Sequence, residues 1–349
     1  MAYGDVAAIE KIPGVQEVVL ETRYEPMVVD TNEKADPNTA TSGIMTGTFT
    51  AYAEGYTGAG SRVAIIDTGI DIDHQSFSAA GYDHSMELLA KDAGMTLDAY
   101  KKSVGVLDAV GIADVFSQLN IAKSTTASAV TRNDKIPFAY NYVDKNTKIT
   151  HMDDEQGEHG SHVAGIAAAN KYIANADGTF SNALETAKVQ GVAPDAQLVV
   201  MKVFGYGGGA YDSDYMAAIE DAIVLGCDSI NLSLGSSDPG FTRATDIQKR
   251  FDALSDKGAI ISISAGNSEN SYRGLVRMLP GAAAFRILET GSYSADGRAS
   301  FTSSACSLLA RVPITRPFFS YRVLKIPVRY AFSFPWQKTT SGYPDLVLR

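Results

Sequence analysis

The chain has 349 residues, 45% of them hydrophobic, and a formal net charge of -10. This length and apolar content suffice for one large α/β domain or two smaller ones, each with a sizeable core. The negative charge argues against nucleic acid and against an anionic lipid surface as partners, because both would repel the protein. No run approaches about 18 consecutive apolar residues, so we expect no membrane span. The N-terminal residues lack the basic and apolar segments of a secretory signal.

Two different compositions meet near residue 273. Residues 273–349 contain 11 Lys and Arg but only three Asp and Glu, a net charge of +8. Residues 1–272 contain the other 19 basic and 37 acidic residues, a net charge of -18. The two cysteines, Cys227 and Cys306, are too few for a disulfide framework and leave the redox compartment open.

The first 50 residues predict no domain of their own. Residues 6–30 predict a short helix, a turn at Pro13 and Gly14, and a strand over Val15–Leu20. Residues 31–50 are rich in Asp, Asn, Thr and Gly, which is typical of a linker.

An apolar run from Val63 to Ile66 ends on Asp67, which Thr68 and Gly69 follow. Such a run predicts a buried parallel strand with Asp67 at its carboxyl end, where open α/β sheets carry their sites. The simpler interpretation is an aspartate that caps a turn.

Three other functions fit parts of this segment. A dinucleotide site needs its glycines after the strand, but Gly58 and Gly60 precede it, so this interpretation fails. A phosphotransferase with paired aspartates would need an acid where Gly69 stands. An aspartic peptidase would use Asp67-Thr68-Gly69 as half of its site. No second Asp-Thr-Gly or Asp-Ser-Gly occurs, so it would require a homodimer.

The stretch from Glu158 to Ala169 carries His159 and His162 before a run of small residues. The small residues predict a helix packed closely on a sheet, with Ser161 as its N-cap. His159 would then be exposed just before the helix, and His162 would lie in its first turn. Two incidental histidines at a helix start are the simpler interpretation. A zinc site would need a third ligand and no Cys or His cluster supplies one, so we expect no metal and no cofactor.

Residues 83–135 predict a helical insertion, and residues 136–150 return to strand character. Downstream, strands alternate with helices, which is typical of a doubly wound parallel sheet. The expected strands are Gln197–Phe204, Asp228–Leu234 and Ala259–Ala265, and the expected helices are Asp212–Leu225 and Asp246–Lys257. The strand ends are small and polar, so they should gather at one edge with Asp67. Asn267, at one of them, either donates to a developing oxyanion, a contact worth roughly 3 kcal/mol, or simply adopts a left-handed turn.

Three segments, in this order, resemble signature blocks of the subtilases, the subtilisin-like serine peptidases. They are Ile65–Asp71, His159–Gly165 and Ser264–Asn267. Residues 6–30 are similar to the end of the inhibitory propeptide that precedes such domains. Short segments such as Gly55–Ser61 are similar to the cell-envelope, lactocepin-type branch of the family. The resemblance covers about residues 6–273. It implies a subtilisin-like, doubly wound α/β fold that is incomplete at its C-terminal side.

The resemblance implies a role for each matching residue. Asp67 would orient His159, His159 would act as general base and then general acid, and Asn267 would donate to the oxyanion. His162 would be a packing residue. The edges that bind a peptide substrate would be Gly207, Gly208 and Gly209 on one side and Ser233, Leu234 and Gly235 on the other. The implied partners are a peptide or protein substrate and the chain's own propeptide as inhibitor, and the implied location is extracellular or at the cell envelope.

The fourth block of the family, Gly-Thr-Ser-x-Ala, does not occur in the 349 residues. The nearest sequence, Phe301–Ala305, lacks the leading glycine, which makes Ser303 a poor match for the nucleophile. We therefore expect a serine endopeptidase that is itself inactive, or else a non-catalytic peptide-binding remnant. The expected domains are a propeptide remnant (1–30), a linker (31–50), the partial catalytic domain (51–273) and a basic tail (274–349). The composition of the tail suggests the hypothesis that it is translated from a shifted reading frame.

Overall fold

The computed structural model describes residues 39–150, 156–235 and 260–263, together with residues 8, 11–15, 18 and 23–26 and the backbone of residues 292–293 and 299–300. All of them belong to the first of two structural units, residues 1–311. The second unit, residues 312–349, lies outside the described residues, as do the expected helix 246–257, Asn267 and Ser303.

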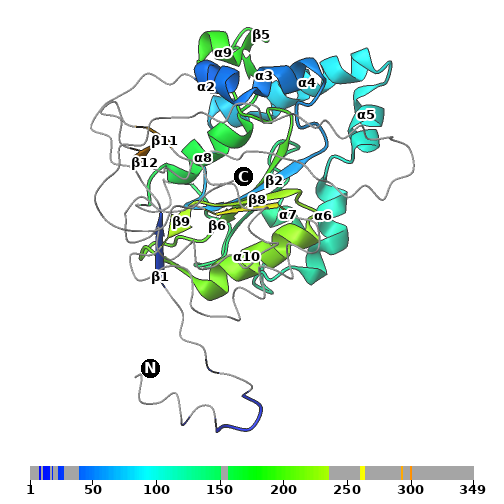
Figure 1. The fold of residues 1–349 in the computed structure, drawn as a ribbon. Coiled ribbons are helices and arrows are strands. Elements are labelled where there is room, and N and C mark those ends of the chain that lie inside the picture. The colour runs from blue at the N-terminus through cyan, green and yellow to red at the C-terminus, as the bar shows by residue number, and fades with distance from the viewer. Residues whose placement is uncertain are drawn as a thin grey trace, which may run out of the picture. The chain divides into compact units, whose positions relative to one another are not determined.

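Five parallel strands form the central sheet, in the order β10-β8-β2-β6-β3 (Figure 1). They are β2 (Arg62–Asp67), β3 (Phe138–Asn141), β6 (Gln197–Lys202), β8 (Ser229–Leu232) and β10 (Ile260–Ile263). The first of these strands in the chain, β2, lies in the middle, and later strands are added on both of its sides. This order confirms the predicted doubly wound parallel sheet.

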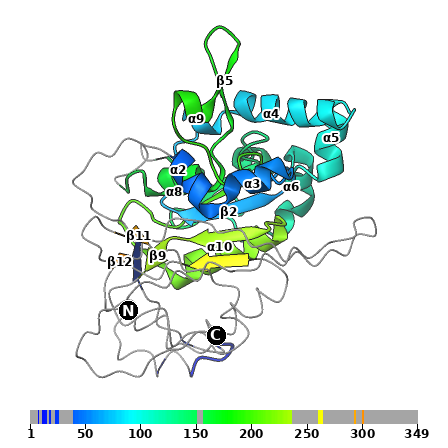
Figure 2. The same cartoon turned by 45° about the horizontal axis from the view of Figure 1, so that its top comes forward.

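Helices and short hairpins surround the sheet. The helices are α2 (Thr39–Thr46), α3 (Thr48–Ala53), α4 (Ala79–Asp92), α5 (Leu97–Val104), α6 (Ala109–Val115), α7 (Ala127–Val130), α8 (His159–Ala168), α9 (Ala183–Thr186) and α10 (Asp212–Val224), with 3-10 helices at Gln75–Phe77 and Phe116–Gln118. β4 (Tyr172–Ala174) and β5 (Phe180–Asn182) form an antiparallel hairpin, seen at the top of Figure 2, and β11 (Ser292–Tyr293) pairs with β12 (Ala299–Ser300).

Side chains of β2 alternate between two apolar cores. Val63 and Ile65 pack in the core that α8 covers, whereas Ala64 and Ile66 pack in the core that α10 covers. Figure 1 shows these two helices on opposite sides of the sheet. Because both faces are covered, every residue of β2 after the first is buried, as expected for a central parallel strand.

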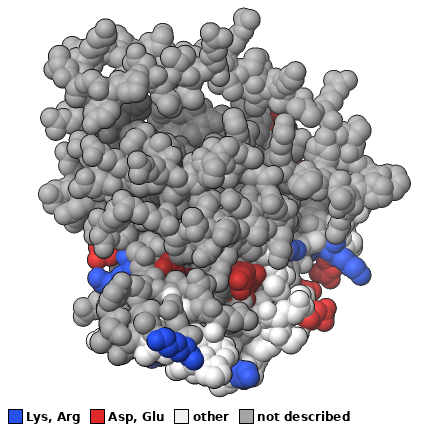
Figure 3. Space-filling view, turned by 60° about the horizontal axis from the view of Figure 1, so that its bottom comes forward, with Lys and Arg blue, Asp and Glu red and all other residues white. Residues whose placement is uncertain are grey.

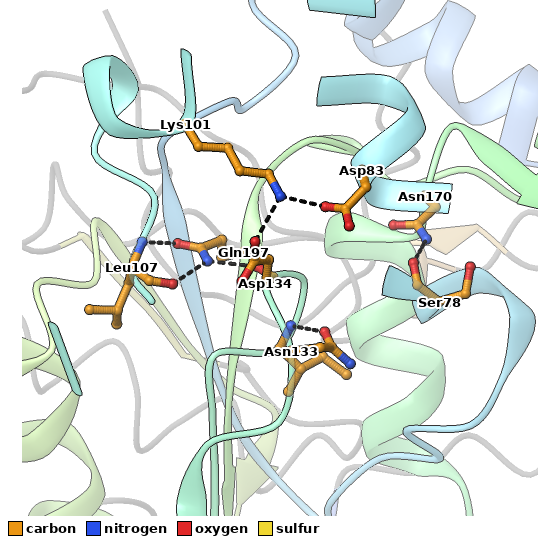
Figure 4. A network of polar contacts seen from close by, with 9 residues as sticks. Ser78, Asp83, Lys101, Leu107, Asn133, Asp134, Asn170 and Gln197 are labelled. Atoms are coloured by element: carbon orange, nitrogen blue, oxygen red, sulfur yellow. Dashed lines mark hydrogen bonds and ion pairs between the residues drawn. The ribbon is translucent and has the colours of Figure 1, made fainter. Parts of the chain in front are cut away.

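The helical insertion that the sequence predicts between β2 and β3 is tied to the sheet by polar contacts (Figure 4). Nζ of Lys101 lies 2.7 Å from a carboxylate oxygen of Asp83 and 2.7 Å from one of Asp134. The side chain of Gln197, the first residue of β6, accepts from the N–H of Leu107 at 2.8 Å and donates to its carbonyl at 2.9 Å. The contacts of Gln197 hold the insertion against the beginning of β6, and those of Lys101 join parts of the insertion to one another.

Part of the stretch expected to be a linker is helical, because residues 39–53 form α2 and α3. The N–H of Thr39 donates to the carbonyl of Lys188 at 3.0 Å, and the hydroxyl of Tyr52 donates to the carbonyl of Gly191 at 2.6 Å. Contacts with a distant part of the chain therefore stabilise these helices, and the polar local composition gave no sign of them.

On the face shown in Figure 3, Lys and Arg side chains lie among Asp and Glu side chains, so the described part of this face carries no patch of a single sign. Among the described residues, no helix combines the length and the apolar character that a bilayer crossing requires.

Lys135, a few residues before β3, is fully buried. Its Nζ donates to the carbonyls of Pro194 and Ala196 at 2.9 and 2.7 Å and lies over the ring of Tyr82. Burial lowers the pKa of Lys135 to about 7, although the neighbouring Asp195 acts in the opposite direction. The protonation of this side chain is therefore coupled to folding.

We expect Lys135→Met to flatten the pH dependence of stability above about pH 7. An unfolded lysine loses its proton near pH 10 or so, so above about pH 7 the unfolded state binds more protons than the folded state. In this window Lys135 should raise the free energy of unfolding by up to about 1.4 kcal/mol per pH unit, and the variant should lack this rise. Urea unfolding at several pH values measures the slope, with Lys102→Met, an exposed lysine, as control. Equal slopes for the unsubstituted chain and Lys135→Met would contradict the prediction.

Candidate active site

The carboxyl end of β2 places Asp67 beneath the first turn of α8. Val63 and Ile65 face α8, so the alternation of the strand puts Asp67 on the same side. Its carboxylate is fully buried, and Oδ1 accepts from the N–H of Thr68 at 2.7 Å. The same oxygen lies 2.8 Å from Nδ1 of His159, the first residue of α8. The predicted aspartate and histidine thus meet, although they are 92 positions apart in the sequence.

The pair is shielded from water mainly on the carboxylate side. The His159 side chain is 13% exposed and the Asp67 side chain 0%. Oδ2 of Asp67 has no hydrogen-bond partner among the described residues. A buried carboxylate favours a neighbouring cation, so it holds the ring with Nδ1 as the donor and stabilises an imidazolium when one forms. Nε2 is then the ring nitrogen that can exchange a proton with a substrate group.

Two glycines allow the strand end and the helix start to meet. A Cβ on Gly160 would lie 2.0 Å from the carbonyl oxygen of Gly69. The N–H of Gly160 donates to Oγ1 of Thr68 at 3.0 Å. Gly69 has a φ of +96°, in the left-handed region that favours glycine. The Asp-Thr-Gly and His-Gly sequences therefore reflect a close approach of two backbones as well as the chemistry of their polar side chains.

Lys202 is a member of this site that sequence reasoning missed. It is the last residue of β6, it pairs with Asp67 in the parallel register, and it is fully buried. Its Nζ donates to the carbonyl of Thr68 at 2.5 Å, which holds the turn that follows Asp67. The only signal in the sequence was a lysine inside the apolar run from Leu198 to Phe204.

Two expectations about the start of α8 are wrong. Ser161 is not the N-cap, because the helix begins at His159 with Glu158 in the N-cap position. The hydroxyl of Ser161 instead donates to Oε2 of Glu158 at 2.6 Å and accepts from the N–H of Asp71 at 2.7 Å. His162, expected to be a packing residue, is exposed, and His159 is the more buried of the two because its ring turns toward the carboxylate below it.

A short antiparallel sheet lies at the segments expected to bind a peptide. Its strands are β1 (Arg23–Pro26) in the centre, β7 (Ala210–Tyr211) on one side and β9 (Leu234–Gly235) on the other. Tyr24 pairs with Ala210, and Glu25 pairs with Gly235. The chain's own residues 23–26 thus lie between the two edges in an extended conformation. Most of the strand expected at residues 15–20 lies outside the described residues, and β1 is a strand that the sequence did not predict.

The predicted edge residues fall in or beside these strands. Leu234 and Gly235 form β9, the buried Ser233 precedes them, and Gly207, Gly208 and Gly209 lie just before β7. A Cβ on Gly209 would lie 2.4 Å from Nε of Arg23, so this glycine lies against β1. Asn267 and Ser303 lie outside the described residues. Within the described ranges, no group of three His, Cys, Asp or Glu side chains is arranged to hold a metal ion.

The subtilase family model, peptidase S8, matches residues 58–315. This match covers most of the chain and includes Asp67, His159, β7 and β9. The chain belongs to the subtilase family. The match runs past residue 273, where we expected the resemblance to end, so residues 274–315 are also part of it.

Individual relatives agree with the lactocepin-type resemblance. The PI-type proteinase of Lactococcus lactis subsp. cremoris is 30% identical over 270 residues, which cover 76% of this chain and 12% of that protein. The PII-type proteinase of Lacticaseibacillus paracasei is 30% identical over 272 residues, again 76% of this chain and 12% of the relative. The C5a peptidase of Streptococcus pyogenes serotype M3 is 30% identical over 268 residues, 71% of this chain and 19% of the relative. The chain therefore spans less than a fifth of the length of these subtilases.

Gly160→Ala should destabilise the domain, because its methyl group would meet the carbonyl oxygen of Gly69 at 2.0 Å. Overpacking of this kind costs about 1 to 3 kcal/mol of unfolding free energy. Gly165→Ala, later in the same helix, is the matched control, since a Cβ there meets nothing within 4 Å. In a helix interior alanine is favoured over glycine by about 0.5 to 1 kcal/mol, so the control should be neutral or stabilising. Urea unfolding compares the two variants, and equal effects would contradict the close approach.

Proposed function

We propose that this chain carries the Asp-His half of a serine endopeptidase site, in which Asp67 orients His159 and His159 transfers protons. One observation carries the proposal, namely the contact of 2.8 Å between Oδ1 of Asp67 and Nδ1 of His159 at the carboxyl edge of the sheet. Membership of the subtilase family supports it. The reaction is hydrolysis of a peptide bond by acyl transfer to a serine and then to water.

In the proposed mechanism, Nε2 of His159 takes the proton of the serine hydroxyl as the serine oxygen attacks the peptide carbonyl. Asp67 stabilises the imidazolium that forms, and the proton then passes to the leaving amine. Asn267 donates to the oxyanion that develops on the carbonyl oxygen. In the second half of the reaction His159 takes a proton from water as the water oxygen attacks the ester carbonyl. The bond to the serine oxygen then breaks, the serine oxygen takes the proton back from His159, and the acyl group leaves as a carboxylic acid.

The nucleophile is the part of the triad that the 349 residues do not supply in its usual sequence, Gly-Thr-Ser-x-Ala. We therefore propose that these residues do not complete the acyl transfer by themselves. Loss of the serine from such a triad lowers turnover about a millionfold, a value that comes from subtilisin, itself a subtilase. Ser303 is the residue whose substitution tests this part of the proposal.

The strands β7 and β9 are, in this proposal, the edges that bind an extended peptide, and residues 23–26 occupy them as an inhibitory propeptide segment would. The antiparallel pairing of β1 with both strands supports this assignment. It also favours a second candidate function, a peptide-binding remnant of a peptidase. A location outside the cell or at its envelope is part of the proposal and rests on the lactocepin-type resemblance.

An aspartic peptidase has no comparable support. Such a site needs two carboxylates that share a proton. Asp67 instead contacts an imidazole, and its carboxylate oxygen Oδ1 is already bonded to the N–H of Thr68.

Asp67→Asn should change the tautomer of His159. A carboxylate can only accept, so Nδ1 carries the proton in the unsubstituted chain, whereas an asparagine can turn its amide N–H toward Nδ1 and leave the proton on Nε2. Nitrogen-15 NMR of histidine-labelled protein, at a pH where the rings are neutral, distinguishes the two tautomers. His74, whose Nδ1 accepts from the N–H of Ser76 at 3.3 Å, is the internal control and should not change. An unaltered tautomer at His159 would show that the carboxylate does not orient the ring.

A fluorophosphonate probe, which reacts with activated serines, should leave the chain unlabelled, because the 349 residues lack the usual nucleophile block. The measurement is labelling of the full chain and of His159→Ala, Ser303→Ala and the matched control Ser304→Ala. Labelling that disappears in His159→Ala and Ser303→Ala but persists in Ser304→Ala would establish a complete triad and overturn the proposed inactivity.

A further inference from the structure

Tyr24 is the residue of β1 whose side chain enters the domain. It is 0% exposed, whereas the side chains of Arg23 and Glu25 are 52% and 62% exposed. Its hydroxyl donates to Oδ1 of Asp212 at 2.8 Å. Its ring meets the ring of Tyr215 edge to face, with the centroids 5.3 Å apart. Of these three consecutive residues, Tyr24 alone is enclosed by side chains of another element.

The enclosing residues belong to the first turn of α10, directly after β7. Asp212 is the first residue of the helix, where the helix dipole favours a carboxylate. Tyr215, on the same helix face, donates to the same Oδ1 at 2.6 Å. Burial raises the pKa of Tyr215, and Tyr24 and Asp212 raise it further, so its hydroxyl stays a donor. Asp212 therefore presents a buried, charged acceptor beside an aromatic ring.

We infer that Asp212 and Tyr215 form a pocket that selects a tyrosine side chain from a peptide bound between β7 and β9. The inference rests on the proposed peptide-binding role of these strands and names the chemical class of the peptide. The selected peptide is an extended strand whose residue opposite Ala210 carries a phenol. Tyr24 supplies this phenol from within the chain, and a separate peptide has to supply its own.

The selectivity comes from the hydroxyl as well as from the ring. Phenylalanine would fill the same space but would take one hydrogen-bond donor away from Asp212. Hydrogen bonds to a buried charged acceptor separate two such ligands by about tenfold to a hundredfold in affinity. Alanine would also lose the edge-to-face contact and leave a cavity. The order of affinity is therefore Tyr, then Phe, then Ala.

Peptide binding to the full chain tests this order. The protein carries Tyr24→Ala, which empties the pocket, and His159→Ala, which prevents hydrolysis. It is titrated with fluorescent peptides of residues 21–28 that have either the native tyrosine or phenylalanine in place of Tyr24. The tyrosine peptide should bind about tenfold more tightly or better. This preference should shrink to a few fold when Asp212→Asn is added and persist when Asp214→Asn is added, which removes the same charge from the same helix turn.

The two ways of failing are distinguishable. Equal binding of both peptides would overturn the selective pocket and leave the proposed peptide-binding edges in place. Binding of neither peptide would overturn the pocket and the edges together. The proton-transfer pair of Asp67 and His159 is tested separately by the tautomer of His159, which does not depend on the peptide.

A second variant tests the same contact without a foreign peptide. Tyr24→Phe in the otherwise unchanged chain keeps the ring and its packing, so the fold should be retained. The amides of β1 should then exchange with deuterium about tenfold faster or more than in the unsubstituted chain, because β1 opens more often. Tyr100→Phe, in α5, is the control and should leave this exchange unaltered. Unchanged exchange of β1 in Tyr24→Phe would overturn selection through the hydroxyl.

Discussion

The close contact between the end of β2 and the start of α8 is the constraint on which the site depends. The backbone at Gly160 approaches the carbonyl of Gly69 so closely that no side chain fits between them. Because the start of α8 is fixed at this point, the alternation of side chains along β2 directs Asp67 toward the helix. His159, the first residue of the helix, then contacts its carboxylate. Lys202 holds the intervening turn from the neighbouring strand. The geometry of the pair is therefore imposed by the backbone and its nearest polar contacts.

The same arrangement explains why a carboxylate is buried in the middle of an apolar fold. Burying a charge costs several kcal/mol unless donors compensate it, and among the described residues the two donors to Asp67, the N–H of Thr68 and the ring of His159, both reach Oδ1. The stability of the domain comes instead from the two apolar cores on either face of the sheet. Because water does not reach this carboxylate, its field on the imidazole is not screened, as the proposed role of Asp67 requires.

The sheet and the aspartate-histidine pair could be predicted because their signals are local. β2, β6, β8 and β10 are apolar runs, and Asp67 and His159 stand where such a run or a helix meets a turn. What could not be predicted depends on contacts between distant segments. Helices α2 and α3 have a polar composition and form where they contact residues 188–192, and β1 has no apolar run and is a strand because β7 and β9 flank it. The exposure of His159 and His162 likewise follows from which ring faces the carboxylate.

In the proposed peptide-binding role, the shortness of β1 determines which groups can distinguish one peptide from another. β1 forms two residue pairs with β7 and two with β9, and strand pairings of this length are marginal by themselves. Main-chain hydrogen bonds hold any extended peptide, so they do not distinguish sequences. Discrimination must then come from side chains, and in β1 the side chain of Tyr24 is buried while Arg23 and Glu25 are exposed. The proposed recognition is therefore concentrated on the phenol of Tyr24, which contacts the beginning of α10. This helix also covers one face of the sheet, so the proposed peptide site and the core of the fold share an element.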